Sequence, residues 1–583
     1  MLSQRSTPVK MSQEAARKLP RWSLLALLTI FAFSGFWATG LWTLRDALSF
    51  GTASAMLDGG ASAWLMPMMA DSPITEAGPL AGWLTAVIIA FGRLTGLMGD
   101  IAAVRFAACL LFALTTAALW YGTWHLARRP EAQPIAFAFG GEASPRDYSR
   151  VVADVAVLLF VATFGILTRQ HEALPDTTLL TMAALSFYGL TLGIRRPVPG
   201  AFTAGLAAGL AVVSSTLFAS CWLLVLALIT IQCLKAFSHH RPKRLLITIA
   251  GALAGFLPWP LLAFAVDPAQ AAVWFGEWLP AQLAHFSLAG SDTYLWFARN
   301  ALWYLCPIWP FAIWGLYVWR HQIRQTHILL PAAALMAGIP AVVFSSFQAY
   351  DTVFLAFLPM LSVTAAFGLV TVRRGYENVL DWFSLTIFTL GLLVLWAYWF
   401  AWLTSFAPKM AESLQMLAPG SAPVFDSGLV LACLVSLVWF VFVGWRLTHR
   451  PIVVWRGPWL SAAGMTAVAV TWLAAAGITA FSASLVGLYH TALDVNRSYE
   501  PVVKAVARNL EAKGMQPGDV VCGTGMNHGL QAVFKHYADL DVLVRARPDE
   551  CRFTIDRSRS GALLPDSFRR PHTDEAFTVI QNR

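Results

Sequence analysis

The sequence is poor in charged residues, which make up 13% of its 583 residues, whereas hydrophobic residues make up 57%. A typical soluble domain has roughly 25% charged and 45–50% apolar residues. A soluble core cannot bury this excess of apolar side chains, so a lipid bilayer must surround much of the surface. The 25 tryptophans agree with this conclusion, because Trp concentrates at the two membrane interfaces.

The seven cysteines form no CxxC pair and no spacing typical of a metal site. Five of them lie in or beside apolar segments, where we expect them to pack as small hydrophobic residues; these are Cys109, Cys221, Cys233, Cys306 and Cys433. Cys522 and Cys551 lie in the polar C-terminal segment. The sequence leaves open whether these two cysteines form a disulfide or remain free thiols. An oxidising compartment would favour the disulfide.

The sequence also lacks the features of a nucleic-acid or nucleotide site. Its net charge of +9 arises from 41 Lys and Arg against 32 Asp and Glu, and most of the basic residues occur in short pairs between apolar runs. This pattern is typical of membrane topology signals and not of a phosphate-binding face, so we predict no nucleic-acid partner. The GTG at 523–525 has neither the Walker spacing nor a following Lys, and we expect a turn there.

Thirteen apolar runs are long enough to cross a hydrocarbon core of about 30 Å, which takes ~20 helical residues. They lie near 22–44, 101–126, 150–168, 176–194, 199–216, 218–236, 244–264, 296–319, 327–346, 352–371, 380–403, 428–446 and 458–488. The basic segment 1–21 precedes the first run, and no small-residue cleavage site follows it. We therefore expect an uncleaved anchor with a cytoplasmic tail.

The basic loops decide whether a fourteenth apolar stretch, 80–97, also spans the membrane. With thirteen spans, every basic cluster falls on the cytoplasmic side with the N-terminus, as the positive-inside rule requires; the clusters lie at 128–150, 195–196, 235–244, 320–324, 373–374 and 446–456. A spanning 80–97 would move all of them to the other side. We therefore predict that 80–97 is a helix in the outer interface.

This topology divides the chain into three parts: a basic tail over 1–21, a transmembrane domain over 22–488 that includes a long external loop at 45–100, and an external domain over 489–583. Long loops in a compact protein are usually functional. In the external domain we predict an α/β fold with helices at Tyr499–Ala512 and Asn527–Tyr537, and strands at Asp519–Cys522, Asp541–Val544 and Arg552–Ile555.

Acidic residues gather on the external side. Asp46 follows Arg45 at the end of the first run, and acids at a membrane edge are costly and often functional. Arg45 could instead simply neutralise Asp46, Glu76 could only complement the dipole of the next helix, and Asp176 could only cap its helix. The loop that contains His171 and Glu172 has no known metal spacing.

The order of these motifs resembles the GT-C glycosyltransferases of the protein mannosyltransferase and aminoarabinose transferase type. The resemblance rests on Arg45-Asp46, Glu76, Pro79-Leu80, Trp83-Leu84, Phe91-Gly92, Arg105, Pro175-Asp176, Tyr294 to Trp309 and Asp351 to Pro359. It implies a GT-C fold for the whole chain, with interfacial helices in the first external loop. Such enzymes usually have Asp-Glu where this chain has Asp46-Ala47, and often Lys-Pro-Pro-Leu where it has Ala77-Gly78-Pro79-Leu80.

What the resemblance implies is inverting transfer of a hexosyl or pentosyl group from a polyprenyl-phosphate donor to an envelope acceptor, at the periplasmic face of a bacterial inner membrane. Asp46 would be the base, because partial desolvation at the membrane edge would make it a better proton acceptor. Glu76 and Asp176 would orient the substrates. The residues expected to contact the substrate or its phosphate are Arg45, His171, Glu172, His285, Arg299 and Tyr350.

Several alternatives stay open at this point. Metal dependence varies across the class. Whether this protein uses a divalent cation therefore stays open, although no metal motif is present. The absent lysine weakens aminoarabinose transfer to lipid A, and the acceptor is a lipid, a glycan or a protein. The chain could instead be a flippase or transporter of lipid-linked sugars, or an inactive partner in envelope assembly. Transporters, however, tend to place charges near the bilayer midplane.

Overall fold

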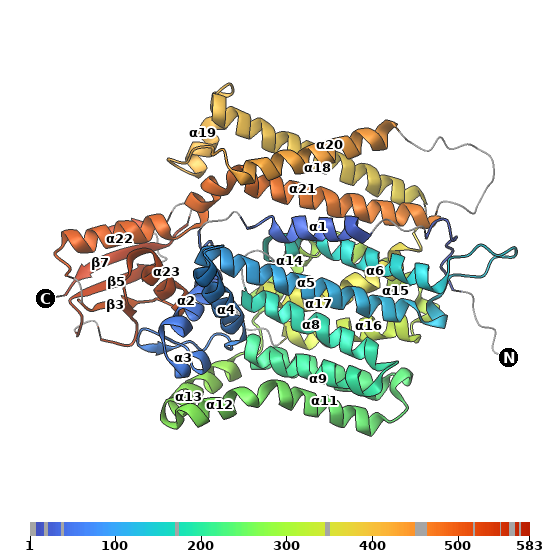
Figure 1. The fold of residues 1–583 in the computed structure, drawn as a ribbon, viewed down its shortest axis with the longest axis horizontal. Helices are drawn as coiled ribbons and strands as arrows, with labels where there is room; N and C mark the ends of the chain where they lie inside the picture. Colours follow the sequence, from blue (N-terminus) through green and yellow to red (C-terminus); the bar gives the residue numbers. More distant parts are fainter. Residues whose placement is uncertain are drawn as a thin grey trace.

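The structure is a computed structural model that describes residues 7–16, 21–36, 40–169, 174–343, 350–372, 374–448, 463–516, 519–547, 550–558, 566–570 and 573–582. A bundle of helices forms most of the molecule, and a small domain with a β-sheet follows it at the C-terminus (Figure 1). Two of the predicted site residues, His171 and Glu172, lie outside the described residues.

Within the described residues, six helical segments are long and apolar enough to cross a membrane. They belong to α5 (Asp100–Ala127), α9 (Pro197–Ser214), the successive helices α11 (Arg241–Phe256) and α12 (Pro258–Val266), α18 (Arg374–Thr404), α20 (Ser427–Thr448) and α21 (Ala463–Arg497). The chain is therefore a membrane protein by the length and composition of its helices.

The predicted span at 296–319 consists of two helices instead of one. Helix α14 (Ser291–Tyr304) and helix α15 (Ile308–Val318) meet at an angle of 91°. The break contains Pro307, and proline ends helices because it has no backbone N–H and clashes with the preceding turn. Together the two helices make one further candidate span. Hydropathy alone does not detect this bend.

The other predicted spans coincide with helices that are shorter or that extend beyond the fully described segments. These are α1 (Arg21–Phe33), α6 (Pro145–Val161), α7 (Phe164–Arg169), α8 (Leu174–Gly193), α10 (Leu217–Cys233), α16 (Thr326–Val343) and α17 (Tyr350–Leu369). Short 3-10 helices lie in three basic loops, namely η1 (Pro130–Ala132), η2 (Lys235–Phe237) and η3 (Arg320–Gln322). The helices thus follow the hydropathy pattern, but the count of thirteen spans is not confirmed.

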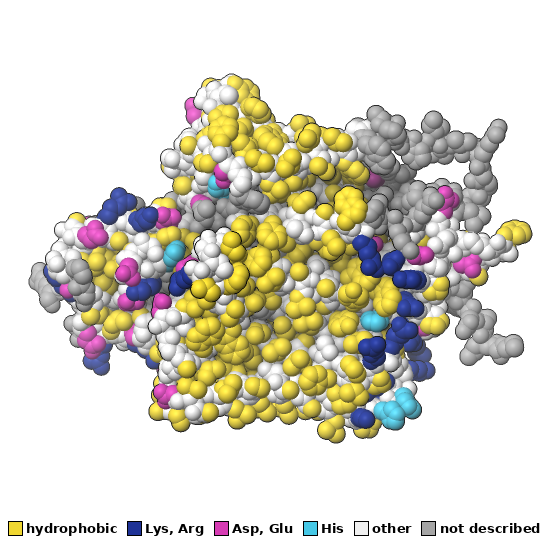
Figure 2. Space-filling model, viewed as in Figure 1, with side chains coloured by type: hydrophobic (Ala, Val, Ile, Leu, Met, Phe, Trp, Pro, Cys, Tyr) yellow, Lys and Arg dark blue, Asp and Glu magenta, His cyan; other side chains and the backbone are white. Residues whose placement is uncertain are grey.

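Charge is distributed unevenly along the bundle. Figure 2 shows a broad hydrophobic surface over the helices, with Lys and Arg gathered at one end, on the right of the view. The loops between α5 and α6 and between α10 and α11 belong to this end. The C-terminal domain lies at the opposite end, where acidic and basic residues are mixed. The bundle therefore has one basic end and one end covered by the small domain.

Short elements of the first external loop lie between the bundle and the small domain (Figure 1). They are α2 (Leu44–Asp58), α3 (Ala61–Leu65), the antiparallel strands β1 (Met68–Met69) and β2 (Ser72–Pro73), and α4 (Leu80–Thr95). Helix α4 occupies the stretch that the sequence predicts to be interfacial. Two further helices outside the candidate spans are α13 (Pro268–Ala284) and α19 (Pro408–Leu417).

The C-terminal domain is an α/β domain with a five-stranded sheet in the order β4-β3-β5-β7-β6. Strand β3 pairs in parallel with β4 and β5, whereas β7 is antiparallel to β5 and β6. The strands are β3 (Val521–Thr524), β4 (Val542–Leu543), β5 (Phe553–Ser558), β6 (Ser567–Arg569) and β7 (Ala576–Gln581), and the helices are α22 (Glu500–Ala512) and α23 (His528–Ala538). These elements confirm the helices and strands predicted for 499–555.

The core of this domain is continuous with that of the first external loop. Phe534 of α23 and Phe553 of β5 are fully buried and belong to the same apolar cluster as Phe50 of α2 and Ile89 of α4. Burial of a large apolar side chain contributes about 1.5–3 kcal/mol. The small domain is thus packed onto the loop and is not merely tethered beside it.

Candidate active site

Asp46 lies in a buried ion pair with Arg105. Helix α2 begins after Thr43, whose hydroxyl accepts a hydrogen bond from the backbone N–H of Asp46 at 3.2 Å. One oxygen of the Asp46 carboxylate lies 3.2 Å from Nη1 of Arg105 in α5, and these two side chains are only 2% and 4% exposed. Arg105 also donates to the carbonyl oxygen of Gly40 at 3.2 Å. The ion pair compensates the charges of two side chains that are almost completely shielded from water.

Asp176 forms a second ion pair a short distance along the same end of the bundle. It lies in the first turn of α8, directly after Pro175. Its Oδ2 lies 2.5 Å from Nη1 of Arg45, and the Asp176 side chain is 8% exposed whereas Arg45 is 29% exposed. Helices α2, α5 and α8 therefore bring together two acids and two arginines, and Arg45 is the most accessible of the four.

Glu76 contacts the C-terminal domain. Its Oε1 lies 2.5 Å from Nδ1 of His528, the first residue of α23. The other ring nitrogen of His528 lies 3.0 Å from the hydroxyl of Ser72. The side chain of His528 is 14% exposed and that of Glu76 is 40% exposed. Glu76 therefore presents a partly accessible carboxylate whose position is fixed from the small domain.

The segment around Glu76 is also held from the side of α13. Gln282 is fully buried, and its amide donates to the carbonyl oxygen of Thr75 at 2.9 Å. The amide oxygen of Gln282 accepts from the backbone N–H of Leu217 at 3.0 Å. A buried amide that uses both its donor and its acceptor fixes the backbone it contacts. Thr75, the residue before Glu76, is thus held through Gln282 of α13, which also bonds to the start of α10.

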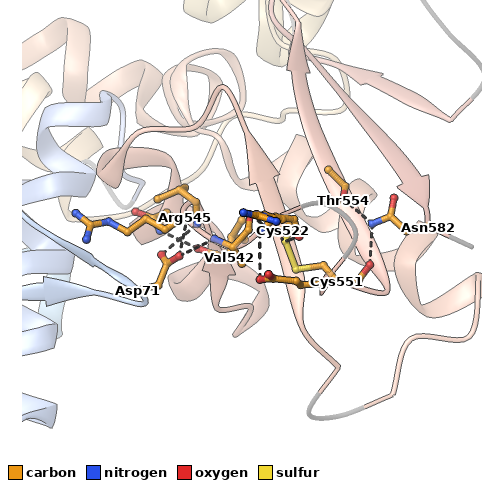
Figure 3. Close-up of a disulfide and its surroundings, with 12 residues drawn as sticks. Asp71, Cys522, Val542, Arg545, Cys551, Thr554 and Asn582 are labelled. Carbon is orange, nitrogen blue, oxygen red and sulfur yellow. Dashed lines mark hydrogen bonds between the residues drawn. A yellow bond between two sulfur atoms is a disulfide. The ribbon is translucent and has the colours of Figure 1, made fainter.

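Asp71 provides a third attachment between the loop and the small domain. Figure 3 shows its carboxylate directed at the segment after β4, beside the disulfide of Cys522 and Cys551. It accepts backbone hydrogen bonds from Val544 at 3.1 Å, from Arg545 at 2.7 Å and from Ala546 at 3.3 Å. Arg545 also forms an ion pair with Glu277 of α13.

The Glu76 contact and the ion pairs of α2 belong to one region. His528 is followed by Gly529, and a side chain at that position would overlap the carbonyl oxygen of Leu44, the residue before Arg45. Further along α23, Tyr537 accepts a hydrogen bond from the backbone of Leu41 at 3.0 Å. The close approach at Gly529 places the start of α23 directly on the first turn of α2.

The remaining predicted contacts have different environments. His285 is half-buried at the end of α13, one turn after Gln282, and burial lowers the pKa of its imidazole. Arg299 is exposed on α14, and in the part of the chain that the structure describes it makes no hydrogen bond or ion pair. Tyr350 begins α17, and its side chain is outside the description. No contact described above connects Arg299 with the Asp46–Arg105 pair or with the Asp176–Arg45 pair.

Three residues that the sequence did not assign to the site take part in its contacts: Arg105, Gln282 and His528. Arg105 belongs to the motif that opens the second span, but that motif gives it no role in the site. Gln282 and His528 belong to no motif, and their partners lie 207 and 452 residues away in the sequence. The one local signal is Asn527, whose side chain caps α23 and so predicts that His528 begins a helix.

An apolar cavity of about 520 Å³ runs between α1, α5 and α6 and also touches Trp472 of α21. Phe33 and Phe106 line one end, and Phe106 directly follows Arg105. Leu25 and Leu110 line the cavity and are exposed, so it opens onto the surface of the bundle. The other end is charged and is lined by Arg21, Asp147, Arg150 and Asp154.

Among the residues that the structure describes, the acidic and histidine side chains of the site do not form a metal centre. In the described ranges, no group of three or more His, Cys, Asp or Glu residues is arranged so that it could hold a metal ion. The carboxylates of Asp46 and Asp176 face arginines, and that of Glu76 faces a histidine.

No protein-family model matches the sequence, and no curated protein matches it significantly. The fold, however, is similar to that of solved ArnT structures, which agrees with the fold that the resemblance of the motifs implies. One similar structure is ArnT from Cupriavidus metallidurans bound to undecaprenyl phosphate, with 15% sequence identity, a TM-score of 0.59, and coverage of 96% of this chain and 97% of that chain.

The apo state of the same ArnT gives a TM-score of 0.60 with the same identity and coverage. The archaeal oligosaccharyltransferase AglB from Archaeoglobus fulgidus, in complex with an inhibitory peptide and a dolichol-phosphate, has 9% identity and a TM-score of 0.43 over 92% of this chain and 69% of that chain. The ArnT comparison covers both the helical bundle and the small C-terminal domain.

Proposed function

We propose that this protein is a glycosyltransferase that moves a sugar from a polyprenyl-phosphate donor to a hydroxyl of an envelope acceptor, on the periplasmic side of a bacterial inner membrane. The observation that carries the proposal is the cluster of Asp46, Asp176 and their arginines at the end of the bundle that the small domain covers. The ArnT fold and the undecaprenyl phosphate bound to that ArnT support it.

The proposed reaction exchanges one bond at the anomeric carbon. Asp46 takes the proton of the acceptor hydroxyl, whose oxygen then bonds to the anomeric carbon as the bond between that carbon and the phosphate oxygen breaks, so the configuration inverts. The electron pair leaves with the polyprenyl phosphate. Arg105 supports the role of Asp46 because the ion pair holds its carboxylate in a fixed position.

Arg45 is our candidate for the donor phosphate. It is the most exposed member of the two ion pairs, and a guanidinium matches the geometry of a phosphate. Asp176 orients Arg45 before the donor binds. Glu76, with a side chain that is 40% exposed, accepts hydrogen bonds from sugar or acceptor hydroxyls. His285 remains a further candidate because it lies one turn from Gln282, which holds Thr75.

The apolar cavity offers a place for the polyprenyl tail. It opens to the lipid-facing surface at Leu25 and Leu110, and its apolar end lies next to Arg105 in the sequence of α5. A tail in this position would leave the phosphate near the arginines of the site. The acceptor is a lipid, a glycan or a protein that carries a free hydroxyl, and Ala77 in place of the family's lysine argues against aminoarabinose as the sugar.

Orientation follows from the two ends of the bundle. The basic end would face the cytoplasm under the positive-inside rule, together with the N-terminus. The C-terminal domain then faces the periplasm, where its Cys522–Cys551 disulfide is chemically stable. Helix α4 lies in the outer interface in this arrangement.

The test is replacement of Asp46 by Asn, which keeps the side-chain volume and removes the base. We expect the rate of transfer from a polyprenyl-linked donor to fall by about 10²- to 10⁴-fold, as is typical for general base catalysis. Asp100→Asn is the matched control, because Asp100 pairs with Arg93 on the same end of α5 but is 29% exposed. Insertion and monodispersity of both variants are checked first. Full activity of Asp46→Asn would remove Asp46 as the base.

One observation favours a second candidate function, the transport of lipid-linked sugars. The cavity has a charged end with Arg21, Arg150 and Asp154, so it could bind a headgroup on the basic side as well. A transferase gives labelled acceptor in detergent, whereas a flippase moves labelled lipid between the leaflets of a vesicle without product. The two activities are separated by measuring both on the same preparation.

A further inference from the structure

His528 is the residue through which the C-terminal domain contacts a candidate substrate-binding group. Its imidazole lies between Glu76 at 2.5 Å and Ser72 at 3.0 Å, and its side chain is 14% exposed. Both partners belong to the first external loop. A ring held at both nitrogens has its orientation fixed, because rotation about the side chain breaks one of the two hydrogen bonds.

Both ring nitrogens of His528 have partners in the first external loop. The Ser72 hydroxyl donates to the carbonyl oxygen of Met69 at 3.3 Å and lies 3.0 Å from Nε2 of His528. On the other side of the ring, Nδ1–H donates to the Glu76 carboxylate. A hydrogen bond to a carboxylate is charge-assisted and is stronger than one between two neutral groups.

Several contacts prevent the small domain from moving away from this position. Asp71 binds three backbone N–H groups after β4, and Arg545 pairs with Glu277. Gly529 sits against the backbone of Leu44, where a side chain would not fit. The domain is thus attached on both sides of His528. Because Glu76 is already fixed in this way, its side chain loses little conformational entropy when a substrate binds to it.

We propose that the C-terminal domain completes the active site and that His528 is a positioning residue, which holds the Glu76 carboxylate in the orientation that binds substrate. The inference rests on the proposed glycosyltransferase function and assigns the small domain a part in it. His528 itself does not bond to the reacting atoms. Its contribution reaches the substrate through Glu76.

The test is a double-mutant cycle between His528→Asn and Glu76→Gln, measured as kcat/KM for sugar transfer. We expect His528→Asn to lower kcat/KM roughly ten- to hundredfold, as loss of a hydrogen bond to a charged group does. In the Glu76→Gln background the same change should have almost no further effect, because the group that His528 positions is gone.

The matched control is His536→Asn. His536 lies on the same helix and also faces α2, but its ring contacts Phe50 edge-on at 4.6 Å, and within the described ranges it forms no hydrogen bond or ion pair with a carboxylate. Any loss in this variant should be equal in the wild-type and Glu76→Gln backgrounds. Equal losses for His528→Asn in both backgrounds would show that it acts only through docking of the domain, and would overturn the proposal.

A second readout does not depend on activity. Hydrogen exchange of the amides at 72–78 should speed up in His528→Asn and stay unchanged in Lys535→Gln, since the partners of Lys535 among the described residues are Asp539 and Asp541, near its own helix. If the wild type transfers no sugar but exchange responds as expected, the proposed function fails while the positioning contact stands. If exchange at 72–78 does not change, the positioning role is refuted.

Discussion

Removal of Arg105 should destabilise the protein far more than removal of a comparable surface arginine. The Arg105 and Asp46 side chains are 4% and 2% exposed, so water does not screen the charge that remains on Asp46 when its partner is lost. Breaking a buried ion pair on one side typically costs about 3–5 kcal/mol. Arg105 also gives up its hydrogen bond to Gly40. We therefore expect Arg105→Gln to lose about that amount of stability.

Arg93→Gln is the control for this prediction. Arg93 of α4 pairs with Asp100 of α5 at 2.6 Å, but the two side chains are 49% and 29% exposed. Exposed pairs of this kind contribute about 0–1 kcal/mol. Both pairs consist of an Arg and an Asp, and both include a residue of α5. They differ mainly in how deeply the two side chains are buried.

Both purified variants are heated in the same detergent. Thermal unfolding is measured as the loss of the fraction of protein that still elutes as a monodisperse peak. The double variant Asp46→Asn with Arg105→Gln should recover much of the lost stability, because it leaves no unpaired charge. Equal losses for Arg105→Gln and Arg93→Gln would refute the reasoning. A double variant less stable than Arg105→Gln would refute it as well.

Three further predictions follow from contacts outside the ion pairs. Reduction of the Cys522–Cys551 bond, which closes a loop with a sequence separation of 29, should destabilise the small domain by roughly 3.5 kcal/mol, measured by limited proteolysis with and without reductant. Asp71→Ala should speed hydrogen exchange at 544–546, whereas Asp71→Asn should do so less because its amide oxygen still accepts. Because burial lowers the pKa of His285, the unfolded chain binds more protons there, so stability should fall as pH drops below about 6.5. His285→Asn should reduce the difference between unfolding midpoints at high and low pH.

Much of the architecture could be predicted because it depends on local patterns. Apolar runs predicted where helices lie, since each run needs only the bilayer thickness and the helical rise. Alternating and helical periodicities likewise predicted the elements at 499–555. The bend between α14 and α15 could not be found by averaging hydropathy, because a single proline causes it while both halves stay apolar.

The acids of the candidate site could be predicted from the sequence, but the residues that pair with them could not. Asp46, Glu76 and Asp176 stood out because acids next to apolar runs are rare. Their partners depend on contacts that no local pattern encodes, since Arg105 is 59 residues from Asp46 and His528 is 452 residues from Glu76. The sequence also predicted a partly desolvated Asp46, whereas the structure has it fully buried beside an arginine.

The small domain is the part whose role the structure changes most. From the sequence we predict only that it is an external α/β domain. The contacts of His528 with Glu76 and Ser72, together with those of Asp71, connect it to the same loop that carries the candidate acids. This connection is why we treat the loop and the domain as one functional unit.

The most direct test of the account is made in a strain that lacks this protein. Its pool of polyprenyl-linked sugars and its envelope glycans and lipids are compared with those of the parent strain by mass spectrometry. We predict that one lipid-linked sugar accumulates while the same sugar disappears from one envelope molecule, and that the wild-type chain but not Asp46→Asn restores it. An unchanged envelope and an unchanged donor pool would contradict the proposed transfer.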